Sequence, residues 1–103
     1  MRISHVVDNL NRGGLERVVI DLARAQAAAG HECQVICLFE AGSLARELAA
    51  DAIPVIACGK RQGVDLRAMW RLRRALAAQR TEVLHSHNGT PHYYATVAAI
   101  GLG

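Results

Sequence analysis

The stretch ISHVVDNLNRGGLERVVIDL, residues 3–22, decides the fold. It opens with a mostly apolar run, residues 3–7, which predicts a β-strand. A polar loop and the pair Gly13 and Gly14 follow, and then apolar residues recur at helical spacing. The residues expected on the buried side of this helix are Leu15, Val18, Val19, Leu22 and Ala23. The stretch therefore predicts a strand, a glycine turn and a helix.

The glycine turn suits an anionic ligand. Glycine takes backbone angles that other residues avoid, and a helix start offers unpaired N–H groups at the positive end of its dipole. The loop also follows the carboxyl end of the first expected strand, where open parallel sheets bind ligands. Neither G-x-G-x-x-G nor the P-loop pattern is present. A tight turn that holds no ligand is therefore the alternative interpretation of Gly13 and Gly14.

The rest of the chain repeats this alternation. Further strands are expected over residues 32–39, 53–57 and 83–87. Helices are expected from Ser43, from Asp65 to about Gln79, and after Thr90, each beginning at a residue that can cap it. The second strand is almost continuously apolar, which is typical of a parallel sheet covered on both faces. The order βαβαβαβα predicts an α/β fold with a doubly wound parallel sheet and right-handed crossovers.

Length and charge narrow the class of protein. The chain has 103 residues, enough for one domain. Its net charge of +3 is too mild to indicate nucleic-acid binding without a clustered face. No signal peptide and no apolar run of membrane-spanning length is visible, so we expect a cytoplasmic protein, with contact at the inner face of a membrane left open.

Three cysteines, Cys33, Cys37 and Cys58, lie in apolar, strand-like runs. An odd count without paired ligand spacing indicates reduced, buried thiols rather than disulfides or a zinc site.

The second polar stretch is LHSHNGTPH, residues 84–92. Alternation along a strand puts His85 and His87 on one side of the sheet. We expect His85 to be packed or hydrogen-bonded in the core, and His87 with Asn88 to face a ligand. Zinc would need a third protein ligand. The candidates are His92, Asp8 and His5. We expect no metal here.

The third expected helix carries Arg67, Arg71 and Arg74 at the spacing i, i+4, i+7, beside Trp70. A solvated basic face is the simplest interpretation of this pattern. Attraction to anionic lipid headgroups is the alternative.

Three segments resemble the amino-terminal domain of the GT-B-fold retaining glycosyltransferases of family 4. They are HVVDNLNRGGLERVVIDLARAQAAAGHE (residues 5–32), VICLFEAGSLARELAADAIPVIACGK (35–60) and VLHSHNGTPHYYATVAAIGLG (83–103), and together they cover nearly the whole chain. The most specific parts are the G-G-L-E-R opening of the first helix and the H-S-H-N at the end of the fourth strand. Within that family, the chain looks most like the bacterial exopolysaccharide and lipid-linked sugar transferases.

The resemblance implies a Rossmann-like domain that binds the acceptor and faces the donor across a cleft. The residues that it places at the donor diphosphate are Gly13, Gly14 and Arg12. Those that it places at the acceptor are His87, Asn88 and Asn11. It assigns no catalytic residue within the chain, and it implies a nucleotide-sugar co-substrate with no metal or other cofactor.

The resemblance also sets expectations for the whole chain. Residues 1–103 would form part of the amino-terminal domain, with the nucleotide-sugar-binding domain absent, so we expect the chain alone to transfer no sugar and to self-associate through its uncovered sheet edge. The parent protein would be a retaining hexosyltransferase of polysaccharide or glycolipid synthesis. The alternative is a non-enzymatic nucleotide- or phosphate-binding α/β regulatory module.

Overall fold

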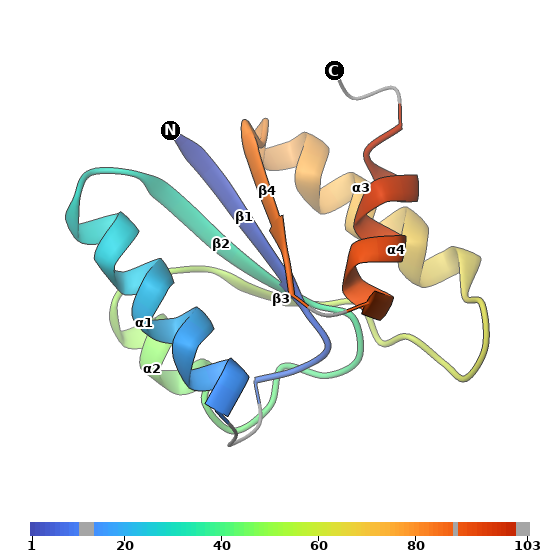
Figure 1. Ribbon diagram of the computed structural model, residues 1–103, viewed down its shortest axis with the longest axis horizontal. Coiled ribbons are helices and arrows are strands. Elements are labelled where there is room, and N and C mark those ends of the chain that lie inside the picture. The colour runs from blue at the N-terminus through green and yellow to red at the C-terminus, as the bar shows by residue number, and fades with distance from the viewer. Residues whose placement is uncertain (11–13, 88, 101–103) are drawn as a thin grey trace.

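The structure is a computed structural model that describes residues 1–10, 14–87 and 89–100. Strands and helices alternate along these residues, as the sequence predicts (Figure 1). The elements are β1 (Arg2–Val7), α1 (Gly14–Ala28), β2 (Glu32–Cys37), α2 (Ala45–Ala50), β3 (Val55–Ala57), α3 (Leu66–Gln79), β4 (Val83–Ser86) and α4 (Gly89–Ala98).

The four strands form one parallel sheet in the order β3-β2-β1-β4. β1 is central and pairs with β2 on one side and with β4 on the other. The chain therefore adds two strands in one direction from β1 and then crosses back to place β4 on its opposite side. This reversal makes the space between β1 and β4 the topological switch point of the sheet. The predicted doubly wound α/β fold is confirmed.

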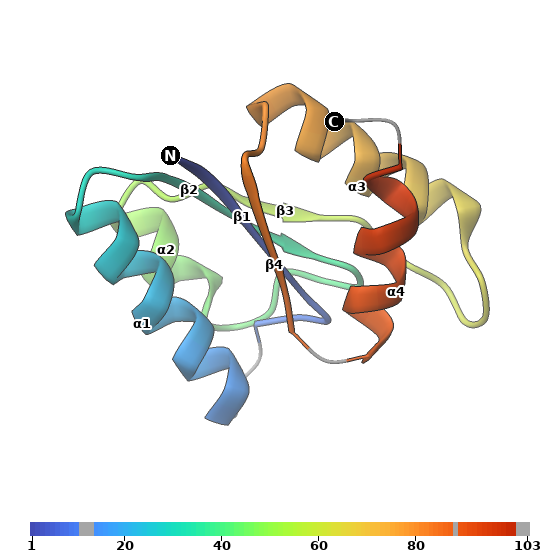
Figure 2. The ribbon, with the colours of Figure 1, turned by 45° about the horizontal axis from the view of Figure 1, so that its top comes forward.

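The helices form a layer on each face of the sheet, with α1 and α2 on one face and α3 and α4 on the other (Figures 1 and 2). Alternation along β1 divides its side chains between the two layers. Ile3 and Val7 pack in the core beneath α1, whereas Val6 packs in the core beneath α3 and α4. Both faces are apolar, which explains why the strand sequences show little polar alternation.

The buried sides of α1 and α3 differ in part from those expected. In α1, Val18 is 57% exposed, while Val19, Ile20 and Ala23 are buried. The consecutive branched residues Val18, Val19 and Ile20 are compatible with more than one apolar side of the helix. Packing against the sheet decides which side is buried. In α3 the buried residues are Ala68, Leu72, Ala75 and Leu76, whereas Leu66 and Trp70 are exposed. The buried side chains of α3 share a core with Val6 and Ile36 of the sheet, and the bulky Trp70 lies outside it.

Two helix starts test the predicted caps. Asp65 caps α3, because its carboxylate accepts the backbone N–H groups of Arg67 and Ala68. The predicted cap at Ser43 is wrong: α2 begins at Ala45, and Leu44 occupies the cap position without a side-chain cap. The Leu44 N–H instead donates to the Leu10 carbonyl, which fixes the chain where it enters α2.

All three cysteines are free and buried, as predicted. Burial raises the pKa of the Cys37 thiol to about 12 and that of Cys58 to about 11. Among the described helices, none combines the length and the apolar character needed to cross a bilayer.

Candidate functional site at the switch point

The candidate site lies where β1 and β4 approach their carboxyl ends. These strands are neighbours in register, with Val6 opposite Ser86, and the His87 N–H continues the ladder by donating to the Val6 carbonyl at 3.0 Å. The link after β1 leads to α1, and the link after β4 leads to α4. Ligands of open parallel sheets bind at such a reversal of strand order.

The described structure contains only part of the predicted site. Gly14 is the first residue of α1, and His87 directly follows β4. The other predicted contacts with donor and acceptor, Asn11, Arg12, Gly13 and Asn88, lie outside the described residues. Of the six predicted contact residues, the structure therefore describes two, Gly14 at the start of α1 and His87 after β4.

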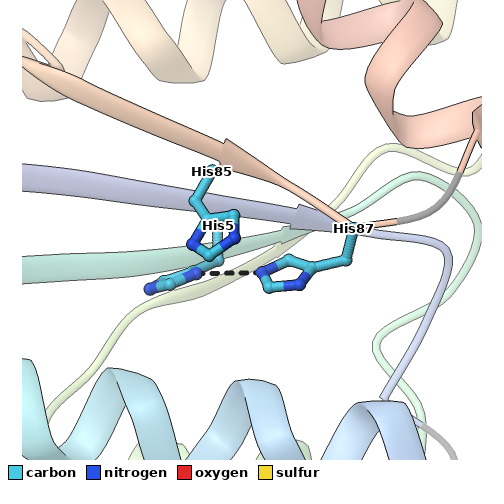
Figure 3. Close-up of side chains that lie close together, drawn as sticks. All are labelled: His5, His85 and His87. Atoms are coloured by element: carbon cyan, nitrogen blue, oxygen red, sulfur yellow. Dashed lines mark hydrogen bonds between the residues drawn. The ribbon is translucent and has the colours of Figure 1, made fainter.

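Three histidines come together beside the switch point (Figure 3). His5 lies on β1 directly opposite His85 on β4, and His87 lies two residues farther along the chain. All three belong to the sheet face that carries α1, and one ligand atom from each lies within 4.8 Å of the others. The His85 and His87 rings stack with centroids 4.2 Å apart. The structure therefore joins the predicted H-x-H pair to His5, a residue from a strand about 80 positions earlier.

Hydrogen bonds fix the protons of the two inner rings. The His5 Nε2 lies 2.7 Å from the side-chain oxygen Oε1 of Gln26, on α1, and therefore donates its proton to it. The His5 Nδ1 is then left as an acceptor, and it lies 3.2 Å from the His87 Nε2. The result is a chain of donors that runs from His87 through His5 to α1.

The pKa of both inner imidazoles lies below its ordinary value. Burial is the main cause for His5, which is fully buried, and the nearby His85 lowers its pKa further. Burial and the other two imidazoles lower the pKa of His87 to about 4. Both rings are therefore neutral near pH 7, and each can use a nitrogen lone pair.

The expectation that His85 is a core histidine is wrong, because its side chain is exposed. β4 is an edge strand of the described sheet, and α1 lies over β1 and β2 rather than over β4. The fully buried histidine is His5, on the central strand, and His87 is buried as well. The signal for it was available, because His5 shares the strand phase of Ile3 and Val7, which face the same core.

Asp8 adds a second polar feature at this edge, directly after β1. Its Oδ1 is buried and has no hydrogen-bond partner among the described residues. Burial raises the pKa of this carboxyl and the nearby Glu16 adds to the effect, while Lys60 opposes it. The charges of Glu16 and Lys60 therefore act on the Asp8 carboxyl in opposite directions.

Lys60 brings a cation to this edge from the segment after β3. Its Nζ donates to the carbonyls of Arg61 and Gly63 at 2.9 and 2.7 Å, and it lies over the rings of Phe39 and Tyr94. The sequence pattern placed this lysine only in a polar loop. Its position follows from tertiary contacts, because the Lys60 N–H donates to the Leu38 carbonyl at 2.7 Å and its side chain lies over the ring of Tyr94, on α4.

Comparison with known proteins identifies the fold and the family. No curated protein sequence matches the chain. A solved glycosyltransferase from Rickettsia africae ESF-5 superposes with a TM-score of 0.73 at 19% identity, over 95% of this chain and 26% of that one. MurG from Acinetobacter baumannii superposes with a TM-score of 0.69 at 18% identity, over 99% of this chain and 31% of that one. At these identities the likeness concerns the fold, and this chain spans between a quarter and a third of each enzyme.

The sequence itself carries the assignment to a family. Residues 12–103 match the family model described as Glycosyltransferase Family 4. The match includes α1 from its first residue, the H-S-H-N segment and all of α4, so it covers most of the candidate site. The chain belongs to Glycosyltransferase Family 4.

Proposed function

We propose that this chain forms part of the acceptor-side, amino-terminal domain of a GT-B glycosyltransferase, which transfers a sugar from a nucleotide-sugar donor with retention of configuration. The observation that carries the proposal is the position of the α1 start and of His87 at one switch point, in a chain of this family. Doubly wound sheets bind their ligands at this place. A non-enzymatic regulatory module would share the fold but is not favoured by the family match.

The donor diphosphate would lie against the amino-terminal end of α1. The first turn of a helix has N–H groups without intrahelical partners, and the helix dipole favours an anion there. In this proposal Gly13 and Gly14 let the diphosphate approach the main chain, and Arg12 neutralises its charge. These groups would stabilise the leaving diphosphate as negative charge develops on it.

The acceptor would lie beyond β4, against His87, Asn88 and Asn11. A neutral imidazole and two amides offer hydrogen bonds to sugar hydroxyls without adding a net charge. The low pKa of His87 supports this role, because its ring is neutral near pH 7. In this proposal the transferred group is a hexose and the product is a polysaccharide or a glycolipid. The transfer step uses no metal or other cofactor.

Activity would require a longer protein. We propose that residues 1–103 belong to a larger domain and that a second domain binds the nucleotide, which agrees with the share of the two solved enzymes that this chain spans. β4 is an edge of the described sheet, so the isolated chain would self-associate through it and would transfer no sugar. A cytoplasmic location, with α3 touching the inner face of the membrane, completes the proposal.

The test compares Gly14→Val with Ala25→Val in the full-length enzyme. Both variants add the same branched side chain to α1, at its first residue and at an exposed position farther along. We expect kcat/KM for the nucleotide-sugar to fall by about 100-fold or more with Gly14→Val, because the branched side chain would hold the diphosphate away from the main-chain N–H groups, and losing one donor to a developing oxyanion costs about that much. Ala25→Val should leave it unchanged. Equal kinetics for the two variants would refute the diphosphate site, and an inverted anomeric product would refute retention.

A further inference from the structure

The three histidines at the switch point have the donor set of a metal site. We propose that His5, His85 and His87 bind one transition-metal ion of the Zn²⁺ class and that this ion joins β1 to β4. The proposal concerns the stability of the fold, and it does not rest on sugar transfer. It reverses the expectation of no metal, because the sheet brings a third imidazole to the H-x-H pair.

The distances support a shared ion. Zinc binds imidazole nitrogen at about 2.0–2.1 Å, so two ligands in a tetrahedral site lie about 3.3–3.4 Å apart. The His5 Nδ1 and the His87 Nε2 are 3.2 Å apart. The third ligand atom, from His85, lies within 4.8 Å of both. Because His85 is exposed, its ring can turn toward the ion without disturbing the core.

Gln26 prepares His5 for this role. By accepting the proton of the His5 Nε2 at 2.7 Å, it leaves the Nδ1 lone pair facing His87. Bound imidazoles commonly donate their other ring N–H to such an oxygen, which fixes the tautomer and the ring orientation. On binding the ion, His87 would carry its proton on Nδ1 instead of on Nε2, so that the Nε2 lone pair is free to bind. The ion then replaces the single hydrogen bond between the two rings.

The donor set selects the class of metal. Three neutral imidazoles suit Zn²⁺, Cu²⁺ and Ni²⁺, whereas Mg²⁺ and Ca²⁺ require oxygen ligands. The group contains no carboxylate within the described residues. A fourth position would open toward solvent beside His85, where a water molecule can complete a tetrahedron.

The ion would stabilise the fold by linkage. A ligand that binds only the folded chain raises the midpoint of thermal unfolding in proportion to the logarithm of its concentration over Kd. For a domain of about 100 residues, Zn²⁺ at 100 times Kd should raise Tm by about 10 °C or more.

The experiment titrates the metal-free full chain with ZnCl₂ and follows Tm and binding stoichiometry by calorimetry. We expect one ion per chain, and no rise in Tm with MgCl₂ at the same concentration. His85→Ala should weaken binding at least tenfold, because it removes an exposed ligand from an edge strand. Binding to His85→Ala at wild-type affinity, a Tm rise of equal size with MgCl₂, or no binding at all would overturn the proposal.

Two controls exclude other imidazoles. His92 is exposed and bonds to the Ser86 hydroxyl, and the His31 Nδ1 lies 3.0 Å from the amino group of Met1. His92→Ala and His31→Ala should both bind Zn²⁺ like the wild type. A loss of the 1:1 binding in either variant would place the ion elsewhere and overturn the assignment.

Gln26 gives a second test that keeps all three ligands. Gln26→Glu retains an oxygen that accepts the His5 Nε2 proton, so affinity should be kept or increased. Gln26→Leu removes that oxygen and should weaken binding by about 10- to 100-fold. Equal Zn²⁺ affinity for the two variants would refute the orienting role of Gln26 and, with it, the proposed geometry.

Discussion

The exposed side of α3 gives a sharp prediction about membrane contact. Leu66 and Trp70 are 74% and 57% exposed, and Arg67 and Arg74 lie on the same side, the latter 5.1 Å over the Trp70 ring. Arg71 is part of the fold, because it donates to the Cys58 carbonyl at 2.6 Å. The informative change is therefore Arg67→Glu with Arg74→Glu, which spares Arg71.

The expected size follows from the charges. One basic side chain near an anionic leaflet contributes about 1 kcal/mol of attraction. Reversing two of them removes that attraction and adds repulsion of up to the same size, about 2–4 kcal/mol in all. Since about 1.4 kcal/mol corresponds to a tenfold change, the partition onto anionic vesicles should fall by about 30-fold to several hundred-fold.

The assay is sedimentation with vesicles of neutral lipid or of neutral and anionic lipid, at two salt concentrations. The triple variant Arg46→Glu, Ala49→Glu and Ala25→Glu is a matched control, because it changes the net charge by the same amount at exposed positions of α1 and α2. Binding of the wild type should weaken with salt, and the control should bind anionic vesicles like the wild type. Equal binding of the wild type to both kinds of vesicle, or an equal loss in the control, would refute the reasoning.

Three further predictions concern the fold. Asp65→Ala should lower the stability of the chain, because the Asp65 carboxylate accepts three backbone N–H groups. These bonds lower the pKa of the carboxyl. The difference in the free energy of unfolding between variant and wild type should therefore be largest above the ordinary carboxyl pKa and should shrink as pH falls. A difference in the free energy of unfolding that does not depend on pH would contradict this. Leu72→Ala should cost about 2–5 kcal/mol by urea unfolding, because Leu72 is fully buried, and a cost below about 1 kcal/mol would mean that the core collapses around it. Cys37 and Cys58 should react with a thiol reagent only after unfolding, since burial raises their pKa, and rapid labelling of the native chain would disprove their burial.

The local sequence pattern predicted the helices and strands well, but it did not predict which residues they would contact. The start of α3 could be predicted because Asp65 makes its capping bonds within the next three residues. The start of α2 could not, because it depends on a bond from Leu44 to the carbonyl of Leu10, a residue far away in the chain. The exposure of Val18 and of Trp70 was missed for a related reason, since helical spacing gives the possible apolar sides and only packing selects one.

The candidate site likewise has one part that the sequence determined and one part that only the tertiary structure decided. Alternating apolar strands and capped helices within this one sequence were enough to determine an α/β fold with a parallel sheet, because hydrogen bonds and burial impose fixed periods on each element. They also determined that polar residues follow the strands at a single edge. The order of the strands was decided only in the tertiary structure, because it depends on the side of β1 on which the chain returns after α3. That return placed β4 beside β1, left His85 exposed on an edge strand and brought His5 against His87, a contact between residues 82 positions apart.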